Sequence, residues 1–149
     1  MSNIHESEDD ILVSNERLSD WACSLLLKAG FDANSSKATS EGLVLASLRG
    51  VDSHGIQLLP HYVLAGNAGR LNFNPQFQFK QTGASVGVLD ADHALGFPAG
   101  QYAIEKCVEL AKDTGIGAVS VKNSSHGGML AYYTLPVARK GMFALTMTN

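Results

Sequence analysis

The sequence predicts an α/β fold in which N-terminal helices are followed by a β-α-β-α-β segment. Up to about residue 70, apolar residues recur at helical spacing, and from residue 75 on, short strand-like runs alternate with helical patterns. The chain therefore divides into a flexible tail at 1–13, a helical segment at 14–70 and an incomplete α/β segment at 71–149. No internal repeat or low-complexity tract interrupts this order.

Three helices are predicted in the first segment. Ser14 can cap a first helix that runs to Ala29 and stops at a glycine. A second helix is predicted over 35–49, and a third follows from Ser53, its candidate N-cap, with a proline in its first turn. The stretch RGVDSHGI at 49–56 is therefore a junction between two helices.

Strands and helices alternate in the second segment. In chain order we expect strands over 75–82 and 85–90, a loop over 90–101, a helix ending near 114, a strand over 117–121, a helix over 129–140 and a last strand from 143. The last strand reaches Asn149 in mid-pattern, with no turn or polar tail after it. A strand in an α/β sheet is normally covered by a later helix of the same chain, so we expect the chain to be a fragment of a longer one.

Composition excludes several function classes. The net charge is −3 and the eleven Lys and Arg residues are scattered, which indicates neither a nucleic-acid surface nor a polybasic membrane patch. The acidic N-terminus is unlike a signal peptide, and no apolar run has membrane-spanning length, so a cytoplasmic location is expected. Cys23 and Cys107 lack CxxC spacing, which favours free, buried thiols in a reducing compartment.

His54 is the first candidate for chemistry. It lies between Ser53 and Gly55 in the predicted junction, and a histidine can give or take a proton near neutral pH. A neighbouring hydroxyl can fix its tautomer. The alternative is that Ser53 caps the third helix, Asp52 supports the cap and His54 faces water, and spacing alone leaves both open.

The second candidate is the turn NSSHGG at 123–128, between a predicted strand and a helix. Several backbone N–H groups converge there, an arrangement that suits anionic groups such as cofactor phosphates, with His126 at the centre. The alternative is a capped helix with an incidental histidine. Neither GxGxxG nor GxxxxGK[ST] occurs, so neither a Rossmann fingerprint nor a P-loop is available.

DADH at 90–93 and the tyrosine pair Tyr132 and Tyr133 are weaker candidates. Two acids and a histidine in a loop can bind a metal, as a metal-assisted hydrolase requires, but they are more often turn formers. HxxxH and HExxH spacings are also absent. No metal site is therefore predicted. The two tyrosines are interpreted as core or partner packing.

Taken together, the two motifs resemble those of a known family. RGVDSHGI, then GVLDADHALG at 87–96, then NSSHGG is an order similar to that of the malate/L-lactate dehydrogenase (type 2) family of NAD(P)-dependent 2-oxo acid reductases. LLPHY at 58–62 and TGIGAVSV at 114–121 are further landmarks. The resemblance covers nearly all of the chain from Ser14 and corresponds to the N-terminal half of such a protein.

The resemblance implies a non-Rossmann dehydrogenase fold with NAD or NADP as cofactor. It implies that His54 donates a proton to the substrate carbonyl oxygen and that Ser53 belongs to a proton relay with a carboxylate beyond Asn149. The turn at 126–130 would contact the cofactor through His126, Gly127, Gly128, Met129 and Leu130, and in some members the histidine matching His126 is named as the proton acceptor. A homodimer is implied for the full-length protein.

This sequence departs from the family pattern at two places. Members commonly carry an arginine just after the first histidine motif, where it pairs with the substrate carboxylate, but here Gln57 and Leu58 occupy those positions. Arg49 or Lys122 can substitute for it, and we assign Arg49 as the candidate. Gly127 stands where an aromatic residue is usual, which predicts a more open cofactor site.

The predicted function is hydride transfer between NAD(P)H and a small 2-oxo acid, giving a malate- or lactate-type 2-hydroxy acid. The alternative is a truncated, catalytically silent chain that acts only through pairing with another subunit. The unfinished last strand motivates this alternative, because an open apolar edge is a template for association.

Overall fold

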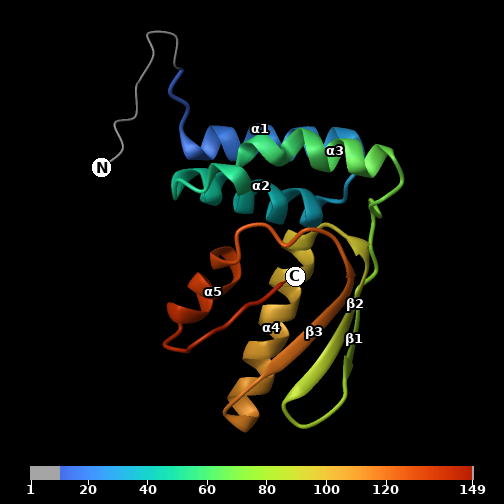
Figure 1. Cartoon of the computed structure of the whole chain (residues 1–149), viewed down its shortest axis with the longest axis vertical. Helices are drawn as coiled ribbons and strands as arrows, with labels where there is room; N and C mark the ends of the chain where they lie inside the picture. The colour runs from blue at the N-terminus through green and yellow to red at the C-terminus, as the bar shows by residue number, and fades with distance from the viewer. Residues whose placement is uncertain (1–10, 149) are drawn as a thin grey trace.

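The computed structural model describes residues 11–148 and has a helical layer above a small sheet (Figure 1). The elements in chain order are α1 (Asn15–Ala29), α2 (Ala33–Leu48), the 3-10 turns η1 (Asp52–His54) and η2 (Ile56–Leu58), α3 (Leu59–Asn67), β1 (Gln78–Gln81), β2 (Val86–Ala94), α4 (Gly96–Thr114), β3 (Ala118–Ser124) and α5 (Ala131–Ala138). The predicted α/β class is confirmed. Within residues 11–148 no helix is both long and apolar enough to cross a membrane.

The first two helices begin and end where local chemistry places them. Ser14 caps α1, and Gly30, at φ 107°, ends it in the left-handed region that favours glycine. Helix α2 begins earlier than predicted because Asp32 is its N-cap, with a carboxylate oxygen that accepts hydrogen bonds from the backbone N–H of Asn34 and Ser35. The predicted extents of both helices are otherwise confirmed to within two residues.

The start of the third helix was predicted incorrectly. Ser53 caps no helix, because its hydroxyl is hydrogen-bonded to the ring of His54, and η1 and η2 precede α3. Helix α3 begins at Leu59, with Pro60 in its first turn, where a missing N–H costs nothing. RGVDSHGI is thus a junction of two tight turns.

The sheet has strand order β1-β2-β3, with β1 antiparallel and β3 parallel to β2. Helix α4 is the crossover between the two parallel strands. The predicted loop at 90–101 is wrong, because β2 continues to Ala94 and α4 begins at Gly96. A bulge after Asp90 re-aims the strand there, with Asp92 and His93 at φ 49° and 58°.

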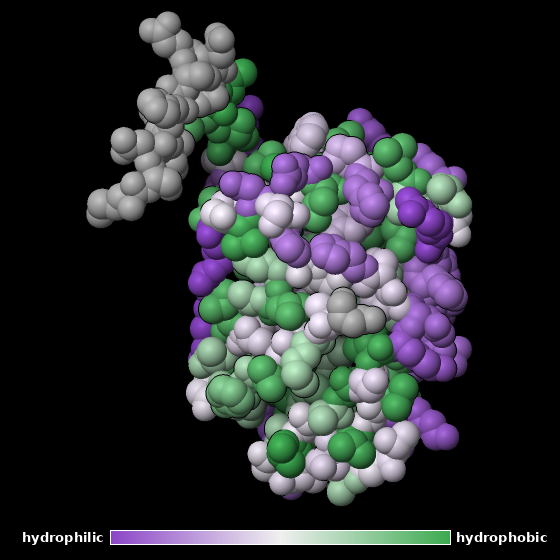
Figure 2. Space-filling model, viewed as in Figure 1, coloured by the Kyte–Doolittle hydropathy of each residue, from purple (hydrophilic) through white to green (hydrophobic). Residues whose placement is uncertain are grey.

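The last strand was also predicted incorrectly. No strand is present between Phe143 and Thr148, and the three-stranded sheet of the described residues does not include this segment. A strand exists only where a second strand supplies the hydrogen-bonding ladder. The apolar alternation therefore stays at the surface, with Phe143 92%, Leu145 68% and Met147 80% exposed. Hydrophobic side chains gather in the lower half of the face seen in Figure 2.

Cys23 and Cys107 are unpaired, as predicted, but each is only half-buried. The buried thiols that were predicted are thus only partly buried, because the helices that carry them, α1 and α4, present one side to water. Burial raises the pKa of the Cys107 thiol, so this group is held in its neutral form.

The side chain of Phe97, on α4, connects the helical layer to the sheet. It is completely buried in the main hydrophobic core, together with Tyr62 of α3 and Tyr133 of α5. A Cβ atom built on Gly42 of α2 would lie 2.2 Å from Cε1 of Phe97. The glycine therefore permits the close approach of α2 and α4.

Gly42→Ala is expected to destabilise the fold despite the better helix propensity of alanine. Overpacking against Phe97 costs about 1–3 kcal/mol, which outweighs a propensity gain of about 1 kcal/mol. Chemical denaturation measures the change. Lys37→Ala, on the exposed side of the same helix, is the control, with an expected change within about 0.5 kcal/mol. An unchanged or higher stability of Gly42→Ala would show that Phe97 moves aside freely.

Candidate active site

The first histidine is positioned by a tight approach of the junction to α2. The backbone N–H of Ile56 donates to the Ser47 hydroxyl at 3.0 Å, and a Cβ on Gly55 would lie 2.3 Å from the same oxygen. Only glycine therefore lets the two turns fold against α2. This contact fixes the direction in which the junction presents His54.

The second histidine follows β3 and lies against the start of α4. The Ser125 hydroxyl accepts a hydrogen bond from the backbone N–H of Gly96 at 3.1 Å, and the Ser125 N–H donates to the Ala94 carbonyl at 3.1 Å. A Cβ on Gly96 would lie 2.0 Å from the carbonyl oxygen of His126. The glycine that opens α4 thus makes room for the backbone of the turn.

These two loops bring His54 and His126 together. Their ring centroids are 5.1 Å apart, with the planes inclined at 33°. Each Nδ1 has a hydroxyl partner at 3.0 Å, which is Ser53 for His54 and Tyr62 for His126. The two candidate motifs form one site, and each imidazole has its Nε2 atom left for other partners.

Burial and charge set the protonation of this site. Partial removal from water lowers the pKa of His126, and positive charge on His54 and His61 lowers it further. Burial raises the pKa of Tyr62 to about 12, so its hydroxyl keeps its proton at neutral pH. The arrangement disfavours two positive charges on the adjacent rings.

The turn from His126 to Leu130 has unused backbone donors. Within the described residues, no hydrogen bond is donated by the backbone N–H groups of residues 126–130. The carbonyl of Gly127, in contrast, accepts a hydrogen bond from the buried Tyr133 hydroxyl at 2.5 Å. A turn with engaged carbonyl and free N–H groups suits an anionic ligand.

The five turn residues differ in what they can offer. Beside Gly127 a Cβ would meet only Leu130, at 3.6 Å, whereas Gly128 has φ 65° and its Cβ would lie 2.2 Å from Phe97. Met129 is buried and Leu130 packs against the main core. Both side chains are therefore engaged in packing, while the open side of the turn is at Gly127.

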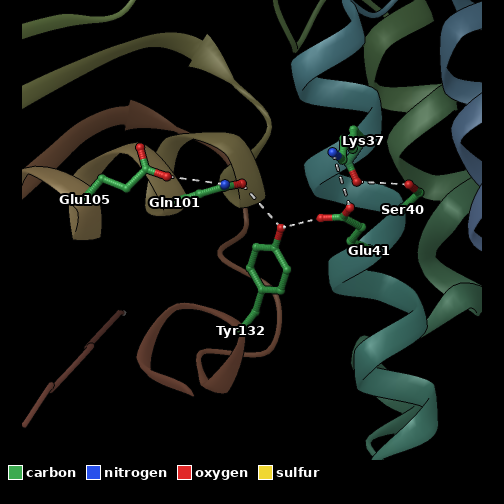
Figure 3. Close-up of polar contacts among 6 residues, drawn as sticks. All are labelled: Lys37, Ser40, Glu41, Gln101, Glu105 and Tyr132. Atoms are coloured by element: carbon green, nitrogen blue, oxygen red, sulfur yellow. Dashed lines mark hydrogen bonds and ion pairs between the residues drawn. The ribbon is translucent and has the colours of Figure 1, made fainter. Parts of the chain in front are cut away.

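Helix α5, which follows the turn, is held by a polar bridge from Tyr132. Its hydroxyl lies 3.4 Å from a carboxylate oxygen of Glu41 on α2 and 3.3 Å from the side-chain oxygen of Gln101 on α4 (Figure 3). Burial, and then the charge of Glu41, raise the pKa of this tyrosine. The neutral hydroxyl thus connects three helices and steadies the start of α5.

The basic residues considered for the substrate carboxylate are not gathered at the histidines. Arg49 is exposed just after α2, and within the described residues its side chain forms no hydrogen bond or ion pair with His54 or His126. Lys122 forms an ion pair with Asp90 at 3.0 Å. Gln57 donates from its amide nitrogen to the Asp52 carbonyl at 2.6 Å and so closes the junction. The candidate assignment of Arg49 stays a prediction.

The acids of DADH have structural partners. Asp92 accepts hydrogen bonds from the Asn72 side chain and the Gln76 backbone N–H, at 2.8 and 3.0 Å. Hydrogen bonds from Asn123 and Lys122 lower the pKa of Asp90 to about 2. Among residues 11–148 no group of three or more His, Cys, Asp or Glu side chains is arranged to hold a metal. Nothing there supports the hydrolase alternative.

Sequence reasoning missed Tyr62 and Tyr133 as parts of this site. Tyr62 was interpreted as a residue of the third helix and of the landmark LLPHY, and Tyr133 mainly as core or partner packing, yet both hydroxyls bind the turn at 126–128. The available signal was chemical, because a buried tyrosine hydroxyl needs a hydrogen-bond partner. Which partner it finds depends on the tertiary fold, which brings α3 and α5 to the turn.

An apolar groove lies close to this site. It has a volume of about 720 Å³ and is lined by Leu18, Trp21, Leu25, Ile56, Gln57, Leu59, Pro60, Val63 and Leu64. These residues come from α1, η2 and α3. Neither histidine lines it, so the paired imidazoles are not at its base.

Comparison with known proteins identifies the family. The sequence model of the family described as malate/L-lactate dehydrogenase matches residues 13–149. The chain belongs to this family. It is 38% identical over 142 residues to a malate dehydrogenase of Pyrococcus horikoshii, covering 95% of this chain and 39% of that protein. It is 33% identical over 125 residues to an L-sulfolactate dehydrogenase of Methanocaldococcus jannaschii, covering 84% of this chain and 36% of that protein.

Solved structures of the malate/L-lactate dehydrogenase family share the fold. The structure of the Pyrococcus horikoshii malate dehydrogenase superposes with a TM-score of 0.86 at 38% identity, over 91% of this chain and 39% of that one. The Entamoeba histolytica malate dehydrogenase gives 0.82 at 32% identity, over 87% of this chain and 36% of that one. The chain thus spans about two fifths of the length of the relatives it matches.

The two glycines of the turn are expected to respond differently to alanine. Gly128→Ala meets Phe97 and must adopt a left-handed backbone, which alone costs about 1–2 kcal/mol, so the melting temperature should fall. Gly127→Ala is the matched control and should change stability by at most about 0.5 kcal/mol. Thermal unfolding followed by circular dichroism compares them. Equal losses would contradict the packing described for Gly128.

Proposed function

We propose that this chain supplies the proton-donating part of a nicotinamide-dependent oxidoreductase acting on 2-oxo and 2-hydroxy acids. The observation that carries the proposal is the contact between His54 and His126, whose ring centroids lie 5.1 Å apart. Membership of the malate/L-lactate dehydrogenase family supports it, as do relatives named for malate, sulfolactate and ureidoglycolate. The choice among such acids stays a prediction.

In this proposal His54 is the proton donor. Nδ1 of its ring is occupied by the Ser53 hydroxyl, so the proton leaves from Nε2 toward the carbonyl oxygen of the acid. As the carbonyl carbon gains a hydride, its oxygen gains this proton, and a 2-hydroxy acid results. Ser53 accepts a hydrogen bond from Nδ1–H of the charged ring and so stabilises it before the transfer.

The turn at 126–130 fits a phosphate-bearing cofactor. Its backbone N–H groups have no partner within the described residues, and the side of Gly127 is open. His126, Gly127 and Gly128 would hold the anionic groups, with Met129 and Leu130 contributing backbone only. A bound nicotinamide supplies or accepts the hydride. One relative is named as an NAD(+) enzyme, and the preference between NAD and NADP stays open.

Fluorescence titration of the 149-residue chain with NADH and NADPH tests whether the turn binds the cofactor. Trp21 and the reduced nicotinamide serve as reporters. Saturable binding that weakens in a Gly127→Glu variant is expected, because a carboxylate at the open side repels phosphate. Absence of binding by either nucleotide would leave the turn without its proposed role in this chain.

A second candidate function is suggested by the exposed segment after α5. Phe143, Leu145 and Met147 are largely exposed, as a surface that pairs with another subunit would be. In that case the chain is silent in catalysis and acts only through association. Absent nucleotide binding combined with self-association in sedimentation would favour it. The homodimer and the cytoplasmic location implied by the resemblance stay predictions.

His54→Ala is expected to lower turnover by about 10²–10⁴-fold with little change in cofactor affinity. Activity is measured in a chimera in which residues 14–148 replace the matching segment of the Pyrococcus horikoshii malate dehydrogenase, with malate and oxaloacetate as substrates. His93→Asn is the control, because His93 is exposed and asparagine tolerates its left-handed backbone. Equal losses of turnover and cofactor affinity would make His54 a structural residue.

A further inference from the structure

We propose that Tyr62 is a positioning residue that holds His126 as the neutral tautomer with its proton on Nε2. His126 then donates a hydrogen bond to an oxygen of the bound acid or cofactor and takes up no proton itself. The functional part of this inference rests on the proposed function, whereas the tautomer can be tested without it.

The geometry at Tyr62 leaves its hydroxyl one partner. The side chain is 2% exposed and its ring packs edge-on against Phe97 at 6.4 Å between centroids. Within the described residues, the only hydrogen bond of the hydroxyl joins it to Nδ1 of His126 at 3.0 Å. The buried ring holds this hydroxyl in place, and residues 11–148 offer it no second acceptor.

The number of protons available to Tyr62 and His126 determines which of the two donates in this hydrogen bond. If Nδ1 carried a proton, it would donate to the tyrosine oxygen, and the hydroxyl proton of Tyr62 would be left without an acceptor in a buried place. If Nδ1 is bare, the hydroxyl donates to it and both groups are satisfied. The proton of the neutral His126 ring is therefore on Nε2.

The surroundings of His126 also favour its neutral form. The titratable groups around the ring are His54 on η1, and His61 and Tyr62 on α3, and positive charge on either histidine lowers the pKa of His126 after the larger effect of burial. From α4 and α5 the turn meets Gly96 and the neutral Tyr133, neither of which adds charge. No negative group acts on this ring among the described residues to reverse the preference.

The two histidines differ in the hydroxyl group that each has at its Nδ1. His54 has a rotatable and exposed serine hydroxyl at its Nδ1, which can either accept or donate a hydrogen bond. His126 has a fixed donor at its Nδ1, which favours the bare nitrogen. The site thus presents one ring whose tautomer is free beside one that is held as an Nε2–H donor. A substrate with a carboxylate or carbonyl oxygen provides the matching acceptor.

Long-range ¹H–¹⁵N correlation spectra of the labelled 149-residue chain, at a pH where His126 is neutral, test the tautomer. The His126 signals are assigned by their absence in His126→Gln. We expect the nitrogen frequencies of a bare Nδ1 and a protonated Nε2. A protonated Nδ1 in the unaltered chain would overturn the proposal without any Tyr62 variant.

Tyr62→Phe then tests the cause, because phenylalanine keeps the ring packing and removes the donor. We expect a mixture of both tautomers and a higher pKa of His126, since the hydrogen bond that stabilises the neutral ring is lost. Tyr102→Phe, on the far side of α4 against Phe77, is the matched control and should change neither signal. Unchanged His126 signals in a folded Tyr62→Phe chain would contradict the proposal. Because none of these readouts uses activity, failure of the proposed function would remain distinguishable.

Discussion

The close packing of the Phe97 ring determines how the site is held together. Phe97 is completely buried, and a Cβ on either Gly42 of α2 or Gly128 of the turn would lie 2.2 Å from one of its ring carbons. One ring therefore fills space against both the helical layer and the turn after β3. Since His54 follows α2 and His126 lies two residues before Gly128, the separation of the two histidines depends on that packing.

The α/β class was predictable because the spacing of apolar residues indicates, for each segment by itself, whether one side of a helix or of a strand is buried. Ser14 and Gly30 mark the ends of α1 by their own backbone chemistry, so this helix was predicted to within a residue. The structure of the junction was not predictable. The Ser53 hydroxyl is hydrogen-bonded to the His54 ring and not to a backbone N–H, and the junction is held against α2 by the hydrogen bond from Ile56 to Ser47. The segment from Phe143 has the alternation of a strand, but pattern cannot supply a pairing partner.

The histidines were predictable as candidates from their motifs, whereas their pairing and their hydroxyl partners were not. Helical spacing places Tyr62 on a buried face and says nothing of what its oxygen meets. At the bulge of β2, too, tertiary contacts decided what the local sequence pattern could not predict. The turn predicted at DADH was wrong, because β2 continues through these residues with a bulge, where Asn72 and Asn123 donate hydrogen bonds to the two carboxylates.

The two DADH acids are held at the bulge by hydrogen bonds and one ion pair. Asp90 is paired with Lys122 and Asn123, and Asp92 with Asn72, so these charges are engaged at the bulge. Positive charge on His54 and His61, in contrast, lowers the pKa of His126. Together with the free backbone N–H groups of the turn, they make a site that favours an anion. In the proposed function, this site would receive the carboxylate of the acid. The proposed anion site and the proposed hydrogen bond from Tyr62 then act on the same pair of imidazoles.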